Sequence, residues 1–83
     1  MEYIKLILSK QEPSIDELIA SFERVKENGD VAIIKFDGER IENGYTVFIS
    51  FNKIKKLEMI RIDGNNLKDS LQMILRLYIK SQS

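Results

Sequence analysis

The chain contains neither cysteine nor histidine among its 83 residues. Without cysteine it has no disulfide, no thiolate metal site and no thiol nucleophile. Without histidine it lacks the commonest general base and the commonest metal ligand. A serine or threonine nucleophile would need a lysine or a carboxylate as its base. These absences argue against an enzyme, and we expect no catalytic residue, no metal and no cofactor.

Glycine is scarce and long apolar runs are missing. The four glycines are single turn residues, so the sequence contains no glycine-rich phosphate loop. The apolar run from Ile4 to Leu8 is interrupted by Lys5 and preceded by Glu2, which is unlike a signal peptide. No segment approaches the ~20 apolar residues of a membrane helix. We therefore expect a single cytoplasmic domain over residues 1–83, without membrane contact.

Acidic and basic residues are equal in number, at 13 each, but they are unevenly distributed. Residues 1–42 hold ten acids and six bases, a net charge of −4, and residues 43–83 hold three acids and seven bases, a net charge of +4. Such a split can orient a partner electrostatically. The simpler interpretation is that the first helix has an acidic, solvated face.

The clearest local prediction is a helix that begins after Ser14. Ser14 and Glu17 have the spacing of a capping box, and Asn28-Gly29 provides a left-handed stop. The apolar residues between these ends recur at helical spacing and form one stripe, which consists of Ile15, Leu18, Ile19, Phe22 and Val25.

A second helix is predicted near the end of the chain. Asn66 is the expected N-cap, and Asp69 supplies a carboxylate in the first turn. Its core stripe consists of Leu67, Leu71, Ile74, Leu75 and Tyr78. Met73 and Leu77 form a second apolar row beside it, which is either a helix–helix dimer seam or a cover for the sheet edge.

Four segments have the composition or alternation of strands: 2–8, 31–36, 45–51 and 57–62. In the third, the odd positions from Tyr45 to Phe51 would share a buried face. Asp37-Gly38 and Asn43-Gly44 are both hairpin signals, and either can be the turn; in the second case Gly38 would mark a bulge. In the last strand, either Ile60 and Ile62 or Leu57 and Met59 face inward.

The resulting order, β-α-β-β-β-α, predicts an α/β (α+β) two-layer sandwich. We expect a four-stranded mixed sheet, in which the first helix crosses between parallel strands and the last three strands form an antiparallel meander. Each helix has one main apolar stripe, so both helices should pack on one face of the sheet.

The other face of the sheet would carry Ile7, Ile33 and Phe48, which is more contiguous apolar surface than small soluble monomers usually expose. One interpretation is that a second copy or another protein covers this face. The alternative is that these side chains are scattered among lysine stems and need no partner.

A basic turn suggests nucleic-acid binding as an alternative function. Lys53, Lys55 and Lys56 cluster before Arg61, and an α-β-β-β-α order also occurs in double-stranded-RNA-binding domains. Those domains carry a basic start to the last helix, whereas residues 66–70 hold one base and one acid here. A lysine-rich turn that protects a sheet edge from aggregation explains the same residues.

Two short stretches resemble small bacterial toxin-neutralising proteins. "G-N-N-L-K-D-S-L", residues 64–71, is similar to the strand-to-helix junction of HicB-type antitoxins, and "E-N-G-Y-T-V-F-I", residues 42–49, resembles a stretch of a colicin immunity protein that inhibits a tRNA-cutting nuclease. The resemblance implies an inhibitor that binds one protein tightly, often through acidic surface facing a basic nuclease. The acidic candidates are Glu23, Glu27, Asp37, Glu39 and Glu42.

The sequence therefore predicts a non-enzymatic protein-binding module, of the immunity or antitoxin kind. The partner would be a protein, such as a basic toxin or nuclease, or a second copy of the chain. The alternatives are a small nucleic-acid-binding domain and a structural homodimer or subunit. Salt separates the first two classes, because phosphate binding weakens steeply with salt and a hydrophobic interface does not.

Overall fold

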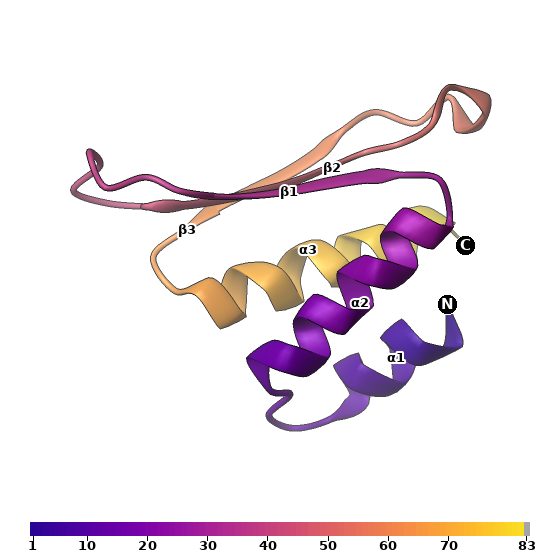
Figure 1. The fold of residues 1–83 in the computed structure, drawn as a ribbon, viewed down its shortest axis with the longest axis horizontal. Coiled ribbons are helices and arrows are strands. Elements are labelled where there is room, and N and C mark those ends of the chain that lie inside the picture. Colours follow the sequence, from indigo (N-terminus) through magenta and orange to yellow (C-terminus); the bar gives the residue numbers. More distant parts are fainter. Residues whose placement is uncertain (83) are drawn as a thin grey trace.

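Three helices and one sheet make up the computed structural model, which describes residues 1–82. In chain order the elements are α1 (Glu2–Ser9), α2 (Ile15–Glu27), β1 (Val31–Phe36), β2 (Tyr45–Ser50), the short 3₁₀ helix η1 (Lys53–Lys55), β3 (Ile60–Gly64) and α3 (Leu67–Gln82). The strands form one antiparallel sheet in the order β1-β2-β3. Helices α2 and α3 lie on one face of this sheet (Figure 1).

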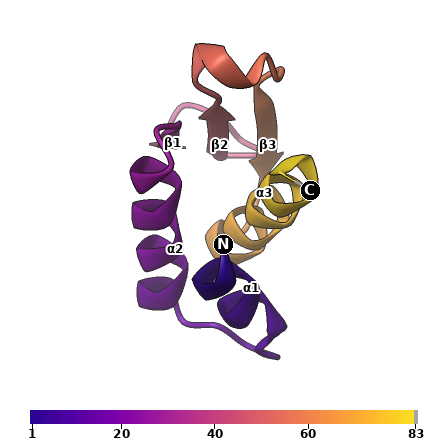
Figure 2. The same ribbon diagram turned by 90° about the vertical axis from the view of Figure 1, so that its right-hand side faces the viewer.

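The predicted four-stranded mixed sheet is wrong, because the first segment is helix α1 and not a strand. A short apolar run fits both periods: Ile4, Leu6 and Leu8 alternate, whereas Ile4, Ile7 and Leu8 have helical spacing. The segment adopts the helix, which buries Ile4, Ile7 and Leu8 and leaves Leu6 60% exposed. Figure 2 shows α1 beneath α2 and α3, on the side away from the sheet.

This correction changes both the faces and the edges of the sheet. Ile7, predicted on the exposed sheet face, is 3% exposed in the helical core. No strand described by the structure pairs with the second side of β1, so β1 and β3 are both edge strands. The predicted parallel crossover does not exist; α2 packs on β1, α3 packs on β2 and β3, and α1 packs on both of these helices away from the sheet.

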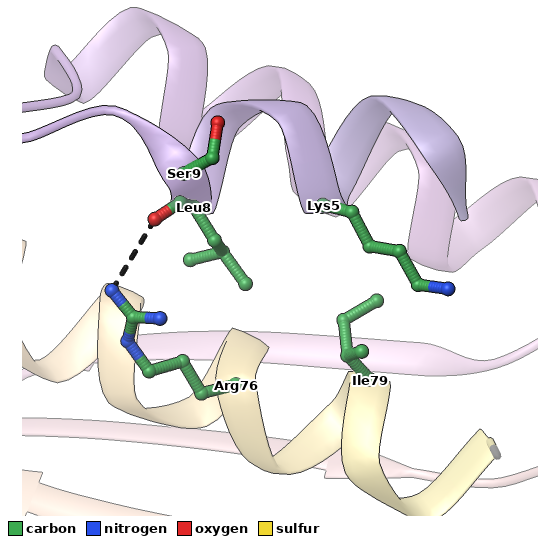
Figure 3. Close-up of a pocket in the computed structure, with 5 residues that line it drawn as sticks. All are labelled: Lys5, Leu8, Ser9, Arg76 and Ile79. Atoms are coloured by element: carbon green, nitrogen blue, oxygen red, sulfur yellow. Dashed lines mark hydrogen bonds between the residues drawn. The ribbon is translucent and has the colours of Figure 1, made fainter.

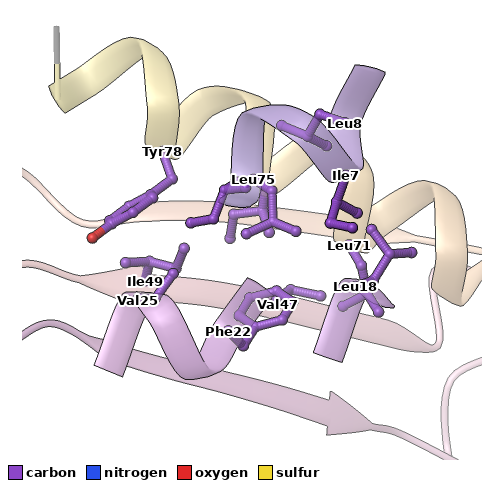
Figure 4. Packing of buried hydrophobic residues seen from close by; sticks show 12 residues of the cluster. Ile7, Leu8, Leu18, Phe22, Val25, Val47, Ile49, Leu71, Leu75 and Tyr78 are labelled. Carbon is purple, nitrogen blue, oxygen red and sulfur yellow. The ribbon is translucent and has the colours of Figure 1, made fainter. Parts of the chain in front are cut away.

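The core lies between the sheet and the helices (Figure 4). Val47 and Ile49 of the central strand are completely buried beneath α2 and α3. The predicted stripe of α2 contributes Leu18, Phe22 and Val25, while Ile19 stays 42% exposed. The predicted stripe of α3 contributes Leu71, Ile74, Leu75 and Tyr78, all at 0% exposure.

Local signals at the helix starts are confirmed. The Ser14 hydroxyl accepts a hydrogen bond from the Glu17 amide, and the Glu17 carboxylate accepts one from the Ser14 amide, which completes the capping box. The Asn66 side chain accepts from the Asp69 amide at 3.0 Å and so caps α3. Just before it, Gly64 is required because a Cβ there would lie 2.3 Å from the Ser70 hydroxyl.

The connection between β1 and β2 contains both predicted turn signals. Strand pairing ends at Phe36 and Tyr45, and residues 37–44 form a loop closed by the Asp37 amide donating to the Gly44 carbonyl at 2.7 Å. Asp37 also accepts from the Glu39 amide, and Asn43 is left-handed with φ 55°. The tip is therefore a wider loop with neither a two-residue turn nor a bulge at Gly38.

Candidate functional site

All three helices lie on one side of the sheet, so no helix covers the opposite sheet face (Figure 2). We call it the outer face. Strand alternation places on it Val31, Ile33, Lys35, Thr46, Phe48, Ser50, Arg61 and Asp63. Its complement, the inner face, carries Ile60 and Ile62 from β3, which resolves the alternatives for that strand: Leu57 and Met59 are exposed and Ile60 and Ile62 pack on the core.

One end of the outer face is apolar and exposed to solvent. Val31 is 55% exposed and Ile33 is 43% exposed, and both point outward from β1. Ile33 is the register partner of Phe48, which is half-buried on β2. We call Val31, Ile33 and Phe48 the apolar patch. Lys35 follows on β1 and Arg61 lies beside Phe48 on β3, so cations flank the patch on two sides.

The other end of the outer face is polar and internally bonded. Asp63 accepts hydrogen bonds from the Thr46 hydroxyl at 2.6 Å, from Arg61 at 3.1 Å and from Arg40 at 3.2 Å. The hydrogen bonds from Thr46 and then Arg61 lower the pKa of Asp63 to about 2. Arg40 also bonds the Asn43 carbonyl, so it ties the β1–β2 loop to the sheet. These polar side chains are hydrogen-bonded to one another, whereas the apolar patch is the exposed apolar part of the same face.

A second polar cluster joins the sheet to α3 at the opposite end. The Asp30 side chain is completely buried and accepts from the Tyr78 hydroxyl at 2.7 Å, from Lys55 at 2.5 Å and from the Asn52 amide at 3.0 Å. Burial alone would raise the pKa of Asp30, but the bonds from Lys55 and Tyr78 outweigh it and lower the pKa. Burial and Asp30 raise the pKa of Tyr78 to about 12. The cluster acts as a structural clamp between layers.

The clamp includes one of the residues predicted to contact nucleic acid. Lys55 is held by Asp30 and by Gln82 on α3, and Arg61 is held by Asp63. Lys53 and Lys56 are exposed around η1, with Ile54 between them at 91% exposure. Of the four predicted bases, Lys55 and Arg61 are therefore held in internal ion pairs. Lys53 and Lys56 remain exposed beside Ile54, and we call these three residues the basic tip.

The predicted acidic residues are not brought together. Glu23 and Glu27 are exposed on α2, whereas Asp37, Glu39 and Glu42 lie in the β1–β2 loop (Figure 1). That loop extends from the end of β1 that is farther from Glu27. Arg24 pairs with Glu27, and Lys35 and Arg40 pair with Asp37. A hydrogen bond from the Glu39 amide contributes most to the lowered pKa of Asp37.

The predicted apolar candidates are divided as well. Met73 and Leu77 are 53% and 39% exposed on α3, away from the outer face. Ile33 and Phe48 remain on the sheet, where they contact across the β1–β2 pair. Val31 extends the patch but was not among the predicted apolar candidates, although it alternates with Ile33 on the same strand.

A shallow pocket lies between α1 and α3 (Figure 3). Its lining consists of Lys5, Leu8, Ser9, Arg76 and Ile79. Arg76 donates to the Leu8 carbonyl at 3.3 Å, and the Ser9 hydroxyl donates to the Leu6 carbonyl at 2.6 Å. The charged groups of this lining are two cations, Lys5 and Arg76.

Two further findings concern residues 1–82. Within this range no three histidine, cysteine, aspartate or glutamate side chains gather closely enough to hold a metal ion. Among the helices described, none combines the length and the apolar character needed to cross a membrane.

No family model matches the chain, and neither does any curated protein or solved structure.

Proposed function

We propose that this protein is a non-enzymatic protein-binding module that binds its partner through the apolar patch. The observation that carries the proposal is the exposure of Val31 and Ile33 beside Phe48 on a sheet face that no helix covers. Contiguous exposed apolar side chains with polar neighbours are typical of protein–protein interaction sites. Aromatic residues at the centre of such a site contribute much of the binding energy, and Phe48 occupies that position.

The charges around the apolar patch indicate the kind of partner. Lys35 and Arg61 lie beside it, and the outer face itself carries these two bases against one acid, Asp63. The β1–β2 loop, at the end of the strands away from the patch, holds Arg40 and three acids, Asp37, Glu39 and Glu42. A partner with an apolar centre and carboxylates at its rim would complement this surface. Neutralisation of a basic toxin through the acidic residues of α2 and the β1–β2 loop stays a prediction that rests on the resemblance alone.

Matched variants test the proposal. Ile33→Glu places a carboxylate in the apolar patch, and Leu77→Glu places one at a similarly exposed position on α3, 39% against 43%. We expect Ile33→Glu to weaken capture of the partner about 30-fold, equivalent to ~2 kcal/mol, while Leu77→Glu leaves it unchanged. Circular dichroism would establish that both variants fold.

Two results would contradict the proposal. One is equal capture by both variants, or a loss confined to Leu77→Glu. The other is capture that disappears after nuclease treatment and falls steeply between low and moderate salt, which is the behaviour of phosphate binding through the basic tip.

A further inference from the structure

Helix α2 covers less of the sheet than its width allows. An α-helix with its side chains is ~10–12 Å across and neighbouring strands are ~4.8 Å apart, so one helix can cover about two strands. Helix α3 does so, because it packs on both β2 and β3, whereas α2 packs on β1 alone (Figure 2). Part of the sheet-facing side of α2 therefore has no strand above it.

The apolar stripe of α2 shows the same gap. Leu18 and Val25 are completely buried, whereas Ile19 in the same stripe is 42% exposed. Ile19 lines a pocket of about 390 Å³ between α2 and the open edge of β1, together with the apolar side chains of Phe22, Val31, Ala32 and Ile34. Val31 also belongs to the apolar patch, so the pocket and the patch are continuous around β1.

The edge of β1 above this pocket is open, since no strand within residues 1–82 pairs with it. The Asp37 amide donates to the Gly44 carbonyl, and these residues continue the β1–β2 register. Hydrogen-bonded positions alternate along an antiparallel pair, so the odd-numbered residues of β1 bond β2. The even-numbered residues direct their amides and carbonyls toward the open edge: Ala32, Ile34 and Phe36. Such a row is a template for one more strand.

The space beside β1 determines what can occupy it. A second folded copy would bring its own α2 beneath its own β1 edge, and the two helices would collide. A single extended segment has no helical layer, so it can lie above α2 in the plane of the sheet. Its side chains opposite Ala32 and Ile34 would then point to the inner face and cover Ile19 and Phe22.

The charged groups of the pocket define which side chains fit. Its lining holds one base, Lys26, and two acids, Glu23 and Asp30. Asp30 already accepts hydrogen bonds from Lys55 and Tyr78, and Glu23 and Lys26 are exposed. A charged side chain over the apolar floor would lose its hydration without gaining a buried partner. The side chains that face the pocket should therefore be apolar, and they alternate with side chains that face outward.

We propose that an extended segment of the partner protein pairs with the β1 edge as an additional strand, with alternate apolar side chains seated over Ile19 and Phe22. The inference rests on the proposed function, because the segment belongs to the protein that binds the apolar patch. Strand addition of this kind obtains affinity from main-chain hydrogen bonds and specificity from pockets for alternate side chains.

Peptides selected from a random phage library on the immobilised protein test this docking mode. We expect the selected peptides to carry apolar residues at every second position. Ile19→Glu should weaken the binding of a synthetic selected peptide about tenfold or more, because it places a carboxylate in the apolar pocket. Leu77→Glu, at a similarly exposed position on α3, 39% against 42%, should leave binding unchanged. No enrichment, selected peptides without alternation, or equal effects of the two folded variants would overturn the proposal.

Methylation of single peptide amides tests strand pairing without any change to the protein. Amides that face β1 alternate with amides that face away, so methylation should abolish binding at every second position only. In the protein, hydrogen exchange of the Ala32 and Ile34 amides should slow when the peptide binds, whereas the Ile33 amide already bonds β2. Equal losses at all methylated positions, or unchanged exchange at Ala32 and Ile34, would contradict the pairing.

The two proposals fail separately. Capture of the partner that depends on Ile33 but is not competed by the selected peptide would overturn the strand docking alone. Peptide binding that behaves as expected, with capture that Ile33→Glu does not weaken, would overturn the role of the apolar patch alone.

Discussion

The two faces of the sheet are built from the same strands but have opposite environments. On the inner face, Val47 and Ile49 are completely buried under two helices. On the outer face, Ile33 and Val31 are about half exposed one strand away. Of twelve exposed large apolar side chains in the described chain, seven lie between residues 31 and 59, in the sheet and its loops. The helices thus stabilise one side of the sheet and leave its other side and its β1 edge available for binding.

The largest expected contrast is between a residue of each face. Ile49→Ala removes completely buried side-chain atoms and should lower the free energy of unfolding by ~2–4 kcal/mol. Ile33→Ala removes atoms that are already half solvated, and should cost below ~1 kcal/mol. Urea denaturation of both variants measures this difference. Similar losses would mean that the outer face is already covered in the isolated protein.

The two aspartate clusters allow a second contrast of smaller size. Asp30→Ala removes a buried carboxylate and leaves Tyr78 and Lys55 without their acceptor, so we expect a loss of ~2–3 kcal/mol, partly relieved because Lys55 can reach water. Asp63→Ala removes an exposed carboxylate and should shift the melting temperature much less. Thermal unfolding at pH 7 compares them, and a larger shift for Asp63→Ala would refute the clamp.

A modest effect at neutral pH is expected for Tyr78→Phe, which should cost ~1 kcal/mol for the lost hydrogen bonds. The contribution of the Tyr78 hydroxyl to stability is expected to change at alkaline pH. The pKa of Tyr78 rises from 10.0 to about 12 in the folded protein, so its stabilising contribution is complete below pH 10 and is lost as pH rises through 12. Absorbance titration of the three tyrosines should show one late transition that Tyr78→Phe removes. A titration without such a late transition would contradict the burial of this hydroxyl.

The sequence predicted the parts of the fold whose signals are local. Ser14 with Glu17 determines the start of α2, and Asn66 with Asp69 the start of α3, because these side chains bond amides within one turn. Residues 2–9 were mispredicted because Ile4, Ile7 and Leu8 satisfy a helical period as well as Ile4, Leu6 and Leu8 satisfy a strand period. The choice depends on burial against α2 and α3, which is not local.

The same limit applies to the candidate sites. Ile33 and Phe48 were identified as exposed apolar residues because alternation within a strand is readable from the sequence. The structural clamp was not identified from the sequence, because Asp30, Lys55 and Tyr78 are widely separated in the chain and meet only when the layers pack. The open edge of β1 became apparent only after the first segment proved to be a helix. The pocket between α2 and β1, with Ile19 and Phe22 in its lining, had no sequence signal either, because it forms only where these two elements pack.

The central claim is that the outer face, and not the helical layer, binds another protein. The most direct measurement is photo-crosslinking in the expressing cell, with p-benzoylphenylalanine replacing Phe48 in one variant and Leu77 in the other. We predict one predominant adduct with a different protein from position 48 and none from position 77. Equal adducts from both positions, adducts from position 77 alone, or adducts only with a second copy of the chain would contradict it.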